Sequence, residues 1–101
     1  MYNNYFNEWL VLNSHRVAQM GIVQNISVNE GVGELPNPTV VVEHSSGQRI
    51  GQVIVWESGF IDFEVMNIKT GELILWEHRD LEGQPNFDNI LGKYFELLIV
   101  Q

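Results

Sequence analysis

Residues 49–78 contain three short segments rich in β-branched and aromatic side chains, separated by two turns that each include a glycine. The segments are RIGQVIVWE at 49–57, FIDFEVMNI at 60–68 and ELILWEH at 72–78. Such composition, bounded by turn residues, is typical of β-strands. Because connections this short join only neighbouring antiparallel strands, residues 49–78 predict a three-stranded antiparallel meander.

The turn at Ser58-Gly59 determines which side chains of the first two segments share a face. A two-residue loop places Glu57 opposite Phe60, and the pairing then runs back along both strands. The face expected to be apolar comprises Ile54, Trp56, Ile61, Phe63 and Val65. The other face is mixed, with an acidic element, and comprises Val55, Phe60, Asp62 and Glu64. A slip of one residue would exchange the two faces.

The second turn, at Lys69–Gly71, is compatible with two registers. Either Leu75 or Trp76 can therefore join the core, and the sequence does not choose between them.

Two further strands are expected before the meander, at residues 22–29 and 39–44, where β-branched residues again dominate. The intervening GVGELPNP, at residues 31–38, contains two glycines and two prolines and is predicted to be a loop.

Amphipathic helices are expected at both ends of the chain. In the first, apolar residues recur near a 3.6-residue period, with Asn3 or Asn4 as a cap and Gly21 as the terminating residue. Its apolar stripe comprises Phe6, Trp9, Leu10, Val17 and Met20, widened by Tyr5 and Leu12. The last helix is expected to begin at Asn86, a favourable cap, with Asp88 in its first turn.

The order of these elements predicts an α+β fold in one domain spanning residues 1–101. We expect an N-terminal helix, an antiparallel sheet of about five strands and a C-terminal helix. Both helices should pack on one face of the sheet, which leaves the other face open to solvent or to a partner.

The chain is strongly acidic, with 13 Asp and Glu against 5 Lys and Arg and a net charge of −8. This charge disfavours nucleic acid and anionic membranes as partners, whereas it attracts a basic protein. Acidity also promotes solubility without any further role. The uneven distribution favours a binding surface, because seven acidic residues fall between positions 57 and 82: Glu57, Asp62, Glu64, Glu72, Glu77, Asp80 and Glu82.

The chain has no cysteine, which rules out a disulfide scaffold and a thiolate site, and its absence is compatible with a reducing compartment. Residues 1–16 lack the basic start and the unbroken apolar run of a signal peptide, so we expect a cytoplasmic protein.

No motif in the sequence indicates catalysis, a metal site or a cofactor. Ser58 lies in ESGF and not in a GxSxG elbow, and residues 31–36 have proline where a phosphate-binding loop needs glycine. Glu77 and His78 point to opposite sides of a strand, so they cannot converge on one metal ion. We therefore expect a protein that is not an enzyme and binds no cofactor.

Two Trp-Glu pairs, Trp56-Glu57 and Trp76-Glu77, stand near the ends of two strands. In one interpretation each Trp fills the core while each Glu faces water. In the other, the Trp residues and the carboxylates form a surface that anchors a partner. The candidate partner-binding residues are Trp56, Glu57, Phe60, Asp62, Glu64, Trp76 and Glu77.

Residues 50–81, IGQVIVWESGFIDFEVMNIKTGELILWEHRDL, resemble the TriTu family of immunity proteins, which are small bacterial proteins encoded beside polymorphic toxins. The matching features are the VWESG turn, the strand Asp62-Phe63-Glu64-Val65, the TGE hairpin and the WEH strand end. The resemblance implies a protein that binds and neutralises a cognate toxin. A toxin that cuts nucleic acid is usually basic, which would suit an acidic partner.

Two alternatives remain open beside this one. The chain could be another acidic interaction module or a homodimer that uses its exposed sheet face. It could instead be an enzyme or a small-ligand binder with a cleft between its sheet and helices. The sequence leaves the oligomeric state undetermined.

Overall fold

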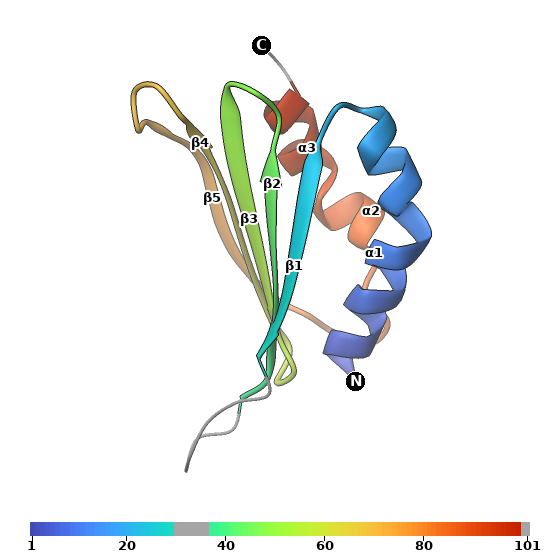
Figure 1. Ribbon diagram of the computed structural model, residues 1–101. Helices are drawn as coiled ribbons and strands as arrows, with labels where there is room; N and C mark the ends of the chain where they lie inside the picture. Colours follow the sequence, from blue (N-terminus) through green and yellow to red (C-terminus); the bar gives the residue numbers. More distant parts are fainter. Residues whose placement is uncertain (30–36, 100–101) are drawn as a thin grey trace.

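The computed structural model describes residues 1–29 and 37–99. A long N-terminal helix, five strands and two short C-terminal helices follow one another along the chain (Figure 1). Their bounds are α1 (Tyr2–Gln19), β1 (Val23–Asn29), β2 (Thr39–Ser45), β3 (Arg49–Trp56), β4 (Phe60–Asn67), β5 (Leu73–Asp80), α2 (Phe87–Ile90) and α3 (Gly92–Ile99). The expected loop at residues 31–38 lies mostly outside the described residues.

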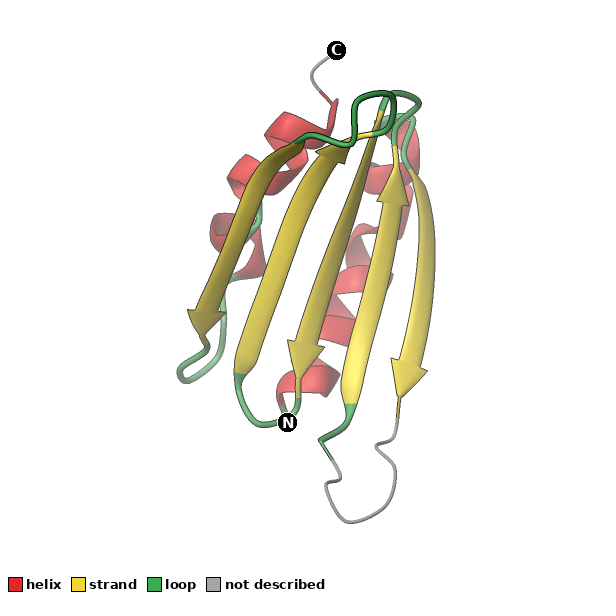
Figure 2. Ribbon diagram, turned by 90° about the vertical axis from the view of Figure 1, so that its left-hand side faces the viewer, coloured by secondary structure: helices red, strands yellow, loops and turns green. Residues whose placement is uncertain are grey.

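The strands form one antiparallel sheet in the order β1-β2-β3-β4-β5, so each strand pairs with its neighbours in sequence. All three helices lie on the same side of this sheet (Figure 1). Turned by a quarter, the molecule presents the bare sheet, with the helices behind it (Figure 2). The predicted α+β class, the five strands and the placement of the helices on one face are therefore confirmed.

The hydrophobic core fills the space between the sheet and the helices. In β2, β3 and β4 every second side chain is buried there, as expected for a sheet with one covered face. The buried apolar residues are Phe6, Leu10, Val17, Ile22, Val40, Val42, Val53, Val55, Ile61, Phe63, Val65, Leu81, Phe87, Leu91, Tyr94 and Leu98.

The register between β3 and β4 differs by one residue from the one predicted. Trp56 pairs with Phe60, so the loop contains three residues, Glu57–Gly59, and not two. Gly59 has a φ of 109° at the third loop position, which is the conformation that three-residue hairpin loops require. The slip leaves the assignment of β4 intact but exchanges the faces of β3. The prediction was wrong for three residues: Val55 is buried, whereas Ile54 and Trp56 face away from the helices.

A shift in register between Val65 and Met66 sets the faces of β5. Leu75 pairs with buried Val65 and packs against the core, while Trp76 pairs with Glu64. The alternative left open by the sequence is thus settled with Leu75 facing the helices and Trp76 facing away.

Helix α1 begins two or three residues earlier than the predicted caps, Asn3 and Asn4, would allow. Met1 is the N-cap and makes no side-chain capping hydrogen bond, whereas Asn3 lies inside the helix and is buried. Asn3 and Asn4 were therefore the wrong caps. Gly21 has a φ of 78° and ends the helix as predicted. Leu12 does not widen the buried stripe, because 82% of its surface is exposed.

The C-terminal helix is interrupted at Leu91, which separates α2 from α3. Asn86 caps α2 as predicted, since its side chain accepts a hydrogen bond from the backbone N–H of Asn89 at 3.1 Å. At the other end, Arg49 and Ser46 donate to the carbonyl oxygens of Leu97 and Leu98. The β2–β3 hairpin thereby satisfies the last turn of α3 and supplies the positive charge that a helix C-terminus favours.

Candidate functional site

The sheet surface turned away from the helices, here called the outer face, is covered by no helix of the described residues (Figure 2). Because side chains alternate along a strand, it is formed by the positions between the buried ones. From β1 to β5 these are Val23, Asn25, Ser27, Asn29, Thr39, Val41, Glu43, Ser45, Ile50, Gln52, Ile54, Trp56, Phe60, Asp62, Glu64, Met66, Leu73, Trp76, His78 and Asp80.

Large apolar side chains are exposed on this face. Trp76 is 59% exposed, Phe60 is 40% exposed and Ile50 is 41% exposed. Trp56, which pairs with Phe60, and Ile54 are half-buried on the same face. Neither Trp56 nor Trp76 fills the core, so the interpretation in which both only pad the interior is wrong. Aromatic side chains presented in this way are typical anchors of protein interfaces.

Four carboxylates share the outer face with these apolar residues: Glu43, Asp62, Glu64 and Asp80. All five basic residues of the chain lie within the described ranges, and none is on the outer face. Arg16 and Lys93 are on helices, Lys69 is in the β4–β5 turn, and Arg49 and Arg79 belong to the helix side of the sheet.

Asp62 forms an ion pair across two strands of the outer face. Its carboxylate pairs with Nδ1 of His78, the residue directly opposite it on β5. The ring of Phe60 stacks on the His78 ring, with centroids 5.6 Å apart and planes inclined by 27°. Sequence analysis did not include His78 in the candidate site, because the contact depends on the register between β4 and β5.

Two adjoining hollows cross the outer face. The larger, of about 300 Å³, lies over β1–β4 between Glu43 and Glu64, with Val23, Ile50 and Met66 among its apolar walls. The smaller, of about 130 Å³, reaches Asp62 and Trp76. Gln52 and Glu64 line both, so the two hollows form one trough. Its walls combine apolar surface with carboxylates, which suits an elongated basic segment with apolar side chains.

Two of the predicted site residues lie away from this trough. Glu57 is in the β3–β4 loop, where its carboxylate pairs with the amino group of Met1. Glu77 is on the helix side of β5 and accepts hydrogen bonds from Nε and Nη2 of Arg79 at 2.9 and 2.6 Å. The structure thus brings together five of the seven candidates, Trp56, Phe60, Asp62, Glu64 and Trp76, on one face.

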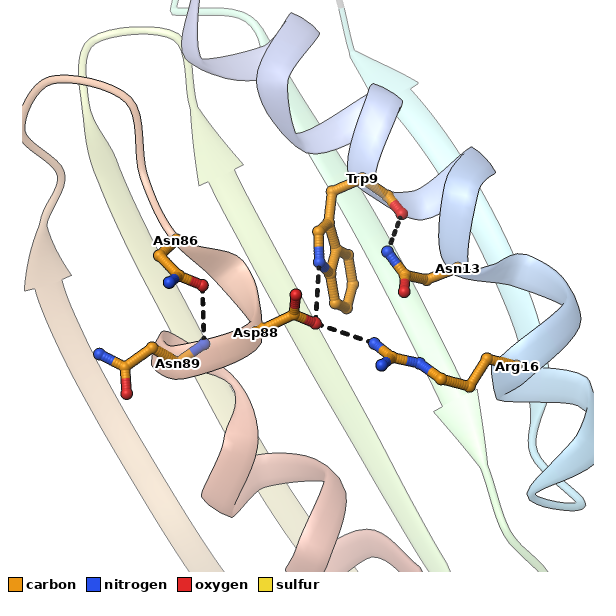
Figure 3. A network of polar contacts seen from close by, with 6 residues as sticks. All are labelled: Trp9, Asn13, Arg16, Asn86, Asp88 and Asn89. Atoms are coloured by element: carbon orange, nitrogen blue, oxygen red, sulfur yellow. Dashed lines mark hydrogen bonds and ion pairs between the residues drawn. The ribbon is translucent and has the colours of Figure 1, made fainter.

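A second groove, of about 300 Å³, runs between α1 and the C-terminal helices. Its polar groups already bind one another: Asp88 accepts hydrogen bonds from Nη2 of Arg16 at 2.9 Å and from Nε1 of Trp9 at 3.3 Å (Figure 3). The Arg16 hydrogen bond holds the pKa of Asp88 below its usual value. Because these contacts join α1 to α2, we attribute the groove to helix packing and not to a ligand site.

Within residues 1–29 and 37–99, no three His, Asp or Glu side chains are grouped so that they could hold a metal ion. In the same part of the chain, no helix has the length and hydropathy needed to cross a membrane.

A family model described as "Immunity protein TriTu" matches residues 4–97, which include all five strands and nearly all of the helical residues. No curated protein matches the chain.

Proposed function

The chain belongs to the TriTu family of immunity proteins, and from this premise we propose that it binds and neutralises the cognate toxin of a bacterial polymorphic toxin system through the outer face of its sheet. Immunity proteins of this kind are generally not enzymes, and we propose that this one also acts by binding alone, in the cytoplasm. The observation that carries the proposal is a sheet face that no helix of the described residues covers and that combines exposed aromatic side chains with carboxylates but no Lys or Arg.

The apolar residues of the outer face support an interface that excludes water. A monomer gains nothing from exposing Trp76, Phe60 and Ile50 on one face, because each would be more stable buried. Trp and other aromatic anchors contribute most to binding where they fill pockets of a partner and become fully desolvated. We propose Trp76 and Phe60 as the main anchors, with half-buried Trp56 completing the apolar area.

The charge of the outer face supports a basic partner. Glu43, Glu64 and Asp80 have no Lys or Arg beside them on this face, and Asp62 is paired only with a histidine. A surface of one sign accelerates the encounter with a partner of opposite sign and excludes partners of the same sign. A toxin that acts on nucleic acid would meet this requirement, because its own substrate is anionic.

Glu57 and Glu77, the two candidate carboxylates that lie away from the trough, should contribute less to toxin binding. Glu57 lies in the loop beside Trp56 and would contact a toxin that extends beyond that end of the sheet. Glu77 is on the helix side, so a toxin would reach it only by wrapping around the β5 edge.

The proposal is tested by coexpression and by titration with the toxin domain encoded beside the protein. The wild-type chain should protect cells and bind at submicromolar concentration. Trp76→Ala should weaken binding about 30-fold, the effect of losing an interface anchor of about 2 kcal/mol.

The matched control is Leu12→Ala, which removes an exposed apolar side chain from α1 on the opposite side of the molecule. It should leave protection and affinity unchanged. Equal effects of the two substitutions, or no complex with wild type at micromolar concentration, would contradict the proposal.

A further inference from the structure

Strand β1 is an open edge of the sheet that carries no charged residue. Its seven residues are VQNISVN, whereas each of the other four strands contains at least one acidic or basic side chain. The opposite edge, β5, has Glu77, His78, Arg79 and Asp80 in succession. Charged side chains are the usual means by which natural sheets prevent an edge from pairing with another chain. Only the β5 edge is protected in this way.

The β1 edge also exposes apolar side chains on the face that the helices should cover. Ile26 and Val28 lie opposite Val42 and Val40, which are completely buried. Yet Ile26 remains 45% exposed and Val28 remains 53% exposed. The core of the single chain therefore stops short of its own edge strand.

We propose that β1 pairs antiparallel with β1 of a second copy of this chain, so that two sheets join into one of ten strands. Antiparallel pairing about a two-fold axis at Ile26 places Ile26 opposite its own copy. Gln24 is then opposite Val28, and Asn25 is opposite Ser27. Each pair joins residues of the same face, so the apolar side chains exposed on the helix side meet across the axis.

Charge singles out a second copy as the occupant of this edge, in contrast to a basic partner. Two chains of net charge −8 repel each other, and contacts between their outer faces would bring carboxylates together. An approach along β1 juxtaposes no charged side chain of the two strands. A basic partner, in turn, would find no carboxylate on β1 to recognise.

Pairing through β1 does not cover the proposed toxin anchors, so the dimer and toxin binding can be tested separately. A two-fold axis normal to the sheet puts the helices of both copies on one side and both outer faces on the other. Trp76 and Phe60, on β5 and β4, are distant in strand order from the joined edge. Loss of the dimer should therefore leave each copy able to bind toxin.

The test is the molar mass in solution, measured by sedimentation equilibrium from micromolar to millimolar protein. Wild type should be dimeric, whereas Ile26→Lys and Ile26→Glu should each be monomeric, because two like charges would face each other across the axis. An equimolar mixture of the two variants should restore dimers of mixed composition. Leu73→Lys, at an exposed position on the other edge strand, is the matched control and should remain dimeric.

Hydrogen exchange supplies a second readout that needs no substitution. The outward-pointing N–H groups of β1 should become protected as protein concentration rises, while those at the outer edge of β5 should not change. A wild type that is monomeric throughout, a dimer that persists in both Ile26 variants, or β1 amides whose exchange is independent of concentration would overturn the proposal.

Discussion

The hydroxyl of Tyr94 in α3 donates a hydrogen bond of 2.7 Å to Nδ1 of His44 in β2, at the centre of the core. The other ring nitrogen, Nε2, donates to Oε1 of Gln24 in β1 at 2.8 Å, because that oxygen can only accept. This chain of contacts joins the C-terminal helix to the edge of the sheet through a neutral imidazole. Burial lowers the pKa of His44 to about 4 and raises the pKa of Tyr94.

The His44 network should make stability depend on pH. The unfolded chain binds a proton on this histidine near pH 6.5, but the folded chain binds it only near pH 4. Its contribution is therefore complete above pH 6.5 and is lost as the pH falls towards 4. The loss should be at most about 3 kcal/mol, the energy of the shift. Urea unfolding between pH 7 and 4 should show a steeper decline for wild type than for His44→Gln, and parallel curves would contradict the assignment.

Replacing Gly51 even by alanine should destabilise the fold. A Cβ at this position would lie 2.4 Å from the hydroxyl oxygen of Tyr94 and 2.8 Å from Cζ. Because Tyr94 is completely buried and hydrogen-bonded, it cannot withdraw, so Gly51→Ala should lower the free energy of unfolding by about 1–3 kcal/mol. Thermal or urea unfolding measures the effect. Gly92→Ala, where a Cβ meets open space, is the control and should not destabilise.

The cap at Asn86 should stabilise α2 measurably. Asn86→Ala leaves the N–H of Asn89 without its side-chain acceptor and should reduce the free energy of unfolding by about 1 kcal/mol. Asn89→Ala is the matched control, because it makes the same Asn-to-Ala change at a residue that contributes only its backbone N–H to the cap. It should have little effect, so equal losses in the two variants would argue against capping.

Electrostatic steering should be visible in the rate of toxin binding. Glu43→Gln and Glu64→Gln keep the shape of the trough but remove charge, so the association rate should fall while dissociation changes less. Raising the salt concentration should lower the association rate of wild type more than that of the variant that combines Glu43→Gln with Glu64→Gln, because ions screen the attraction. Glu8→Gln, on the exposed side of α1, is the control. Stopped-flow kinetics would contradict the steering proposal if wild type, the combined variant and Glu8→Gln showed the same salt dependence of the association rate.

Much of the fold was determined by local sequence patterns. The five strands, the helices at both ends, the cap at Asn86, the termination at Gly21 and the faces of β4 followed from side-chain periodicity and turn chemistry. These features depend on residues within a few positions of one another, and so a single sequence contains the information that determines them. The family resemblance rested on the same central hairpins.

The composition of the candidate site depended on contacts that no local pattern contains. Both parities of β3 are apolar, with Val53 and Val55 on one and Ile54 and Trp56 on the other, so periodicity could not choose the buried face. The choice was made by the three-residue loop, whose Gly59 carbonyl also accepts a hydrogen bond from Leu81, 22 positions along the chain. Trp76 faces outward for a similar reason, because the shift at Val65 realigns β5.

The sequence alone determined which elements form, how many strands the sheet has and how acidic the chain is. Only the tertiary structure decided which aromatic and acidic side chains share the uncovered face, because a register shift of one residue exchanges the two faces at almost no local cost. The same is true of the His44–Tyr94 pair, which joins residues separated by 50 positions and exists only once the helix has packed on the sheet.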